Sequence, residues 1–212
     1  MEENKNMTAE RSLEIIKDQI ERSRRTITKN SSKSLISWGI CVFVFALLIA
    51  YLWKHHGGPV WNVLWAVMWL CGCLAEWFIA KHKEPVPTTF VSKTIGQVWG
   101  TFGIFMGAIG FIFGLAGCGL LDVTFTVSGD NQITHAYINL TSIISLSFGI
   151  ASTITGCILK NRIVQICGVI AGLGGFFCAL QYPWSEQLYV MAAVAVVGLI
   201  VPGFVIYFQN QK

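Results

Sequence analysis

The chain has 212 residues, of which 54% are hydrophobic and only 12% are charged, and its mean hydropathy is +0.60. In a soluble domain of this size, about a quarter of all residues are charged. The composition therefore excludes an ordinary soluble enzyme, a disordered protein and a nucleic-acid-binding protein. It predicts an all-α, polytopic membrane protein.

The first 34 residues form a polar segment with eight Lys or Arg and six Asp or Glu. Within it, residues 8–27 predict an amphipathic helix, because Leu13, Ile16, Ile20 and Ile27 follow a helical spacing. Basic residues that would attract anionic headgroups, at about 1 kcal/mol each, are Arg22, Arg24, Arg25, Lys29 and Lys33. We expect this cytoplasmic segment to lie on the membrane surface or, alternatively, to form a coiled-coil contact with a protein partner.

Six apolar blocks follow, each long enough to cross a bilayer core of about 30 Å, which takes about 20 helical residues. They make up a transmembrane domain over residues 35–208, followed by a tail at 209–212. The predicted spans are Leu35–Trp53, Val60–Ala80, Ile95–Leu121, Tyr137–Leu159, Ile163–Gln181 and Gln187–Phe208. The basic residues that precede the first, third and fifth spans suggest three tandem hairpins, although topology alone imposes much of this pattern.

The orientation follows from the basic residues near the span ends, because Lys and Arg resist translocation. Fourteen of them fall on the side of the termini, and only Lys54 falls on the other side. Both termini should therefore be cytoplasmic, and the number of spans should be even.

The third span contains a glycine stripe with alternating steps of four and three residues. Its members are Gly96, Gly100, Gly103, Gly107, Gly110, Gly114 and Gly117. Glycine lets two membrane helices approach closely, and a 3.5-residue period is typical of a left-handed crossing. We interpret the stripe as a glycine zipper for helix packing; it could also border a pore or mediate self-association into a homo-oligomer.

Small residues on the fourth and fifth spans are the expected partners of this stripe. They are Ser142, Ser145, Gly149, Ser152 and Gly156 on the fourth span, and Gly168, Gly172, Gly175 and Ala179 on the fifth. We therefore expect spans three to five to form the tight inner core. Spans one and two, which are bulky and rich in Trp, should pack at the periphery.

Glu76 is the one clear acidic residue inside a predicted span. Because a charge inside the membrane is energetically costly, such a residue is a candidate for a functional role. Gln97, Thr155 and Gln165 sit at similar depth, so a polar cavity open to the cytoplasm is geometrically possible. The alternative is that Glu76 snorkels or pairs with Lys81, Lys93 or Arg162. Near the same depth, Pro202-Gly203 should kink or loosen the last span.

One longer connection, residues 122–136, alternates apolar and polar residues before the turn residues Ser128-Gly129-Asp130-Asn131. This pattern predicts a small β-hairpin or an ordered lid.

No enzyme motif is present in the sequence: there is no G-x-S-x-G, no H-E-x-x-H and no phosphate-binding glycine loop. His55, His56 and His135 have no Cys or carboxylate ligands beside them, so they do not indicate a metal site. We expect no catalytic activity and no cofactor.

The first 55 or so positions contain four short motifs: Ser12-Leu13-Glu14-Ile15-Ile16, Arg24-Arg25, Lys29-Asn30-Ser31 and Trp38-Gly39. With these motifs, the opening of the chain resembles that of small polytopic membrane proteins of Bacteroides-type bacteria. The resemblance implies a bacterial inner-membrane location and supplies no activity.

The sequence thus favours a non-enzymatic accessory or regulatory membrane component that contacts other membrane proteins or lipids. The alternative is a small transporter or channel for an ion or small solute that uses Glu76 and the nearby polar groups.

Overall fold

The computed structural model describes residues 9–82, 90–117, 120–121, 125–129, 132–136, 139–182 and 184–209. Its helices are α1 Ala9–His56, α2 Leu64–Lys81, α3 Phe90–Gly117, α4 Leu140–Ile158, α5 Arg162–Val169, α6 Gly175–Gln181, α7 Gln187–Ala195 and α8 Val201–Gln209. The π-helical segments Ile170–Gly174 and Val196–Ile200 join α5 to α6 and α7 to α8, and 3-10 turns at Pro59–Val63 and Trp184–Glu186 precede α2 and α7.

Six helical stretches in the described part of the chain are long and apolar enough to cross a membrane. They are Thr28–His56, Val60–Lys81, Phe90–Leu115, Leu140–Ile158, Arg162–Gln181 and Gln187–Gln209. The prediction of a mainly helical protein with six helices of membrane-spanning length is therefore confirmed. The third span begins earlier than predicted, at Phe90 rather than Ile95.

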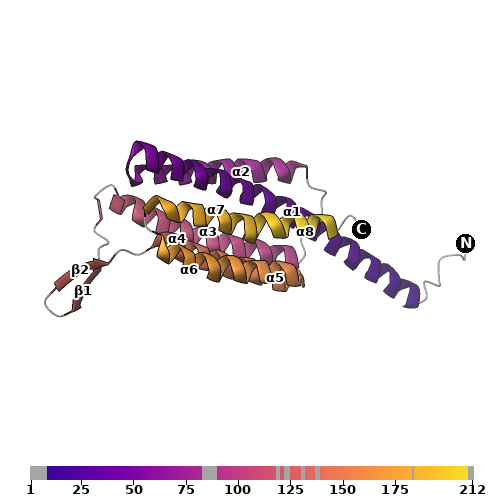
Figure 1. Ribbon diagram of the computed structural model, residues 1–212. Helices are drawn as coiled ribbons and strands as arrows, with labels where there is room; N and C mark the ends of the chain where they lie inside the picture. The colour runs from indigo at the N-terminus through magenta and orange to yellow at the C-terminus, as the bar shows by residue number, and fades with distance from the viewer. Residues whose placement is uncertain are drawn as a thin grey trace, which may run out of the picture.

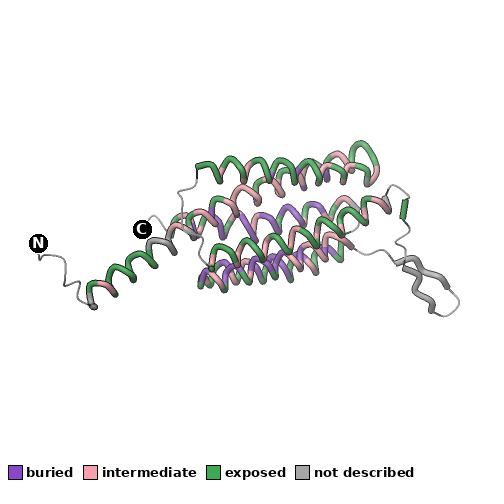
Figure 2. The backbone as a smooth tube through the Cα atoms, turned by 180° about the vertical axis from the view of Figure 1, so that it is seen from behind, coloured by how far each residue is buried: buried purple, intermediate pink, exposed green. Residues whose placement is uncertain are grey.

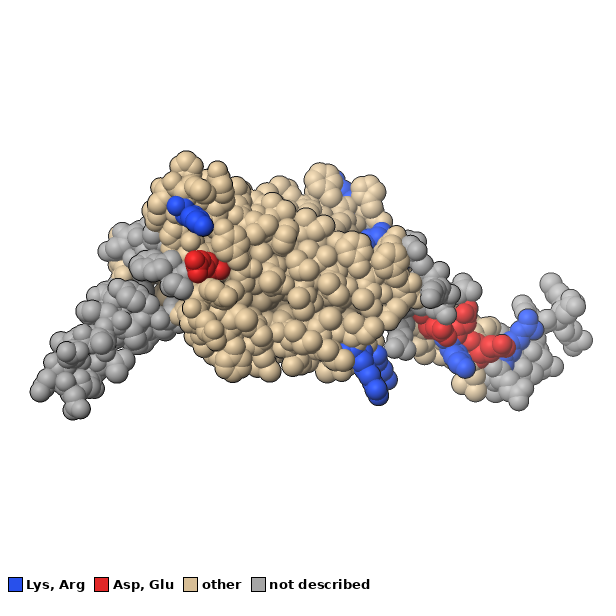
Figure 3. Space-filling view, viewed as in Figure 1, with Lys and Arg blue, Asp and Glu red and all other residues tan. Residues whose placement is uncertain are grey.

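The spans lie side by side in one bundle, with α2 on one flank and α5 and α6 on the other (Figure 1). Buried residues concentrate in α4, α5–α6 and α7–α8, whereas α2 and α3 are mostly exposed or half-buried (Figure 2). Charged side chains gather at the two ends of the bundle and on the N-terminal part of α1, leaving an uncharged belt between them (Figure 3). Such a belt is what a bilayer core requires of a spanning bundle.

The first helix differs from the prediction in its continuity. Residues 8–27 and 35–53 were expected as two helices, but α1 is one helix of 48 residues. It is uninterrupted because residues 9–38 contain neither Gly nor Pro. The N-terminal part of α1 extends past the end of the bundle (Figure 1), where Leu13 and Ile20 are 66% and 63% exposed.

The first span also belongs to the core, which corrects the expectation that it is peripheral. Ala46, Ile49 and Ala50 are fully buried, and the clusters around them include Leu188 and Met191 of α7. A small-residue face makes this close approach possible. By contrast α2, as expected, is peripheral.

The long connection after α3 contains the predicted hairpin. Strand β1 Phe125–Gly129 pairs antiparallel with β2 Gln132–Ala136, with Val127 opposite Thr134. The hairpin lies at the end of the bundle opposite the N-terminal extension of α1 (Figure 1).

Candidate functional site

Glu76 lies on the face of α2 that is turned toward α1. Its Oε1 accepts a hydrogen bond of 2.9 Å from the Ser34 hydroxyl, and its side chain is half-buried. Lys81, one of its suggested partners, places Nζ 3.7 Å from the ring centroid of Trp77. The carboxylate therefore sits in the α1–α2 interface, next to a hydroxyl donor.

The structure does not bring Glu76, Gln97, Thr155 and Gln165 into one cavity. Gln97 is exposed on α3. Thr155 is buried on α4, where its hydroxyl accepts a 3.1 Å hydrogen bond from Trp99 Nε1 and donates to the Ala151 carbonyl. Gln165 Nε2 donates to the Gly156 carbonyl at 3.2 Å. Glu76, Thr155 and Gln165 are each hydrogen-bonded in a different helix pair, and Gln97 is exposed. These four residues therefore do not form the shared polar cavity that the sequence left possible.

The glycine stripe of α3 does not pack against spans four and five. A methyl group added to the exposed members of the stripe would meet no atom within 4 Å; these are Gly96, Gly100, Gly107, Gly110 and Gly114. Gly103 alone among the described glycines of α3 has a close neighbour, the Trp69 ring of α2. The surroundings of Gly117 lie outside the described residues.

The reason is that α3 contacts the bundle through a different face. Ile95, Trp99 and Phe102 pack against the core cluster that contains Phe148. These bulky side chains hold α3 against α4 and leave the glycines facing outward. The expectation that α3 is part of the tight inner core is therefore wrong.

Glycines do form the contact between α4 and the fifth span. A methyl group on Gly172 would lie 2.8 Å from the Gly149 Cα, and one on Gly156 would collide with the Gln165 backbone. Gly168 meets Thr153, and Gly175 meets Ser145 and Val194. The two backbones are in direct contact, so this is the tightest helix pair in the bundle.

A row of buried hydroxyls runs along α4; its serines were predicted only as small packing residues, and Thr155 as part of a polar site. Its members Ser142, Ser145, Ser152 and Thr155 are each at most 1% exposed. Ser142 Oγ and Ser145 Oγ have no hydrogen-bond partner among the described residues. Leaving a buried hydroxyl without a partner costs about 1–3 kcal/mol. The regular polar spacing on an otherwise apolar helix was the signal that could have identified them.

Ser152 compensates for the proline in the last span. Pro202 has no N–H, so it cannot donate to the Gly198 carbonyl four residues earlier. The Ser152 hydroxyl donates to that carbonyl at 3.2 Å, across the helix interface. The last span has a π-helical segment, Val196–Ile200, just before the proline, and the fifth span has one at Ile170–Gly174 without a proline.

The predicted anionic-lipid contacts all lie on α1. Lys29 and Lys33 are exposed, and the side chains of Arg22, Arg24 and Arg25 fall outside the described residues. Across the part of the chain that the structure describes, no group of three or more His, Cys, Asp or Glu is placed to hold a metal ion. Comparisons with protein-family models, with curated proteins and with solved structures gave no match.

Proposed function

We propose that this protein is a non-enzymatic accessory or regulatory component of the bacterial inner membrane, with cytoplasmic termini. The observation that carries this proposal is the N-terminal extension of α1, defined as residues 9–27. Leu13, Ile16 and Ile20 are 66%, 51% and 63% exposed there, and their steps of three and four residues are those of a coiled-coil seam. A helix of a partner protein fits such a seam.

The outward-facing glycines of α3 support the same function. Helices associate within a bilayer through small residues that let their backbones approach. A methyl group added to Gly107, Gly110 or Gly114 would meet no atom of the described residues within 4 Å. The α3 face would receive a membrane helix, from the partner or from a second copy, while the extension of α1 is held outside the bilayer. Lys29 and Lys33 would contact anionic headgroups where α1 leaves the membrane.

The test is co-purification in mild detergent from native membranes, with mass spectrometry of the proteins retained. Two variants are compared with the full chain: one carries Leu13→Ser, Ile16→Ser and Ile20→Ser, and the matched control carries Glu14→Ser and Lys17→Ser. We expect a stoichiometric partner that is lost with the first variant and kept with the second. Equal retention by both variants, or no partner at all, would contradict the proposal.

A small transporter or channel is the second candidate, and the unpartnered hydroxyls of Ser142 and Ser145 favour it. They lie inside the bundle at the α4 face, where Ser145 contacts Gly175 of α6. Buried polar groups between membrane helices are typical of solute pathways. In this case Glu76 would act at the α1–α2 interface as a separate gate.

Proton flux into pyranine-loaded proteoliposomes tests the second candidate. Under it, Ser145→Ala and Glu76→Gln should each abolish flux while the protein stays folded. Glu186→Gln, at an exposed position before α7, is the matched control and should leave flux unchanged. An absence of flux in the unmodified protein would exclude proton transport.

A further inference from the structure

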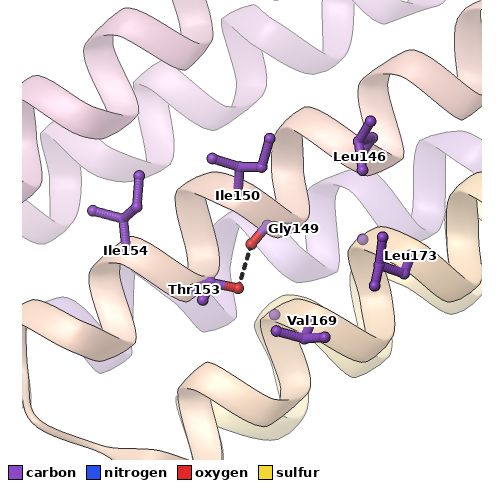
Figure 4. A pocket seen from close by; sticks show the side chains of 9 residues that line it. Leu146, Gly149, Ile150, Thr153, Ile154, Val169 and Leu173 are labelled. Atoms are coloured by element: carbon purple, nitrogen blue, oxygen red, sulfur yellow. Dashed lines mark hydrogen bonds between the residues drawn. The ribbon is translucent and has the colours of Figure 1, made fainter.

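A shallow apolar groove runs along the outer side of the α4–α5 contact (Figure 4). Its volume is about 260 Å³, and both walls belong to predicted membrane spans. The lining residues are Leu146, Gly149, Ile150, Thr153, Ile154, Gly168, Val169, Gly172 and Leu173. The one hydroxyl among them, Thr153 Oγ1, donates to the Gly149 carbonyl at 2.7 Å. The groove therefore offers a ligand no unsatisfied polar side chain.

The groove exists because glycines form its floor. Gly149 and Gly172 bring the two backbones into contact without side chains of their own. Leu146 and Leu173 stand beside this contact as walls (Figure 4). A mostly apolar groove of this kind, on a face of two predicted membrane spans, fits part of a hydrocarbon chain.

Two basic residues lie at the end of the groove, in the turn from α4 to α5. Lys160 follows the end of α4 at Ile158, and Arg162 is the first residue of α5, whose later turns carry Gly168 and Val169 of the groove. At about 1.5 Å per helical residue, Arg162 lies roughly 10 Å before the groove residues of α5. Lys160 is two residues away from it in the same turn.

These two cations have no acidic residue near them in sequence. Both are exposed, and the chain contains no Asp or Glu between Asp130 and Glu186. Figure 3 shows basic side chains at the edge of the bundle, on the end from which α1 extends. The turn therefore presents two exposed positive charges at the level where lipid headgroups would begin.

We propose that the α4–α5 face binds one anionic phospholipid, with an acyl chain in the groove and its phosphate on Lys160 and Arg162. An apolar groove with a pair of exposed cations about 10 Å beyond one end matches the acyl chain and the phosphate of an anionic lipid. The site is independent of the partner-binding role proposed above, because none of its residues lies in α1 or α3.

The backbone at Lys160 provides a variant that removes charge without harming the fold. Lys160 has φ 52°, a left-handed conformation, and the bonds Lys160 N to Cys157 O and Asn161 N to Gly156 O close the end of α4. Glycine is the residue that this helix ending prefers. Lys160→Gly combined with Arg162→Gln therefore removes both charges and should leave the fold intact.

Native mass spectrometry of the full chain, titrated with phosphatidylglycerol or phosphatidylcholine, tests the site. The unmodified protein should hold one phosphatidylglycerol per chain and prefer it to phosphatidylcholine. The charge variant should bind phosphatidylglycerol about 30-fold more weakly, given about a tenfold factor per 1.4 kcal/mol and about 1 kcal/mol per cation. Lys54→Gln with Lys93→Gln removes the same charge elsewhere and should change nothing.

The groove itself is tested with Leu173→Trp, which fills it, against Ile170→Trp, an exposed position that does not line it. Leu173→Trp should weaken binding of both lipids, and Ile170→Trp should weaken neither. Equal binding of the two lipids by the unmodified protein, or equal effects of the two Trp variants, would overturn the proposal. So would a dimer that Leu173→Trp dissociates, since a second copy would then cover the groove.

Discussion

The α4–α5 contact and the glycine face of α3 carry the same kind of sequence pattern and have opposite structural roles. In the first, Gly149 and Gly172 bring two backbones into contact, and an added methyl group would collide with the neighbouring helix. In the second, a methyl group on Gly107 or Gly110 would meet open space. The same small-residue spacing thus serves an internal contact in one helix pair and an outward surface in another.

The difference lies in the residues beside the glycines. On α3, Trp99 and Phe102 pack against Phe148 and fix which face of the helix touches the bundle. On the fifth span, Gly168 and Gly172 themselves face α4 and make the contact. A small-residue stripe therefore predicts that backbones can approach, and the bulky side chains decide which helix face is turned inward.

The largest loss of stability should come from Gly149→Leu, in the α4–α5 contact. The added side chain would meet the backbone of Gly172 and Gly168, which cannot move aside as a side chain can. The cost should exceed the ~1–3 kcal/mol typical of overpacking. A large fall of Tm in detergent, or loss of the folded monomer on gel filtration, is the expected result. An unchanged Tm would mean that α4 and α5 are not in contact as described.

A smaller loss of stability is expected from Ser152→Ala, which tests the role of one buried hydroxyl of α4. The substitution removes the donor to the Gly198 carbonyl, and Pro202 cannot replace it. The expected loss is about 1 kcal/mol in the free energy of unfolding. Thr153→Val is the matched control: the Gly149 carbonyl keeps its helical N–H, so stability should hardly change. If both variants lose the same stability, the cross-helix hydrogen bond has no special role.

The smallest effect on stability is expected from Gly107→Leu, the counterpart of Gly149→Leu on α3. Because nothing lies within 4 Å of an added methyl group, Tm should not fall. The readout that should change is association, measured as the mass of the protein in detergent by light scattering or as loss of a co-purified partner. A fall in Tm without any change in association would contradict the outward orientation of this face.

Much of the fold could be predicted from the sequence because bilayer thickness limits the length of a span. The six spans and the hairpin at 125–136 follow from hydrophobic length and alternation, which are local properties. The position of α1 in the core could not be predicted in this way. Its burial depends on which side chains of α7 it meets, and neighbouring apolar spans look alike in composition.

The candidate site was less predictable for the same reason. Glu76 stood out as a charge inside a span, but the sequence did not reveal that it faces Ser34 of α1. Ser152 and Pro202 are 50 positions apart in the chain. Only the packing of α4 against the last span shows that the Ser152 hydroxyl donates the hydrogen bond that Pro202, which has no N–H, cannot donate.

Because α1 is one continuous helix, its N-terminal extension and the first span would tilt together as one rigid rod. The 19 residues of its N-terminal extension are about 28 Å long at the usual helical rise. A 10° change in the tilt of the first span would therefore move the tip of the extension by about 5 Å. A small change in the tilt of the first span would therefore produce a larger displacement at the tip of the extension, because no break in the helix separates them.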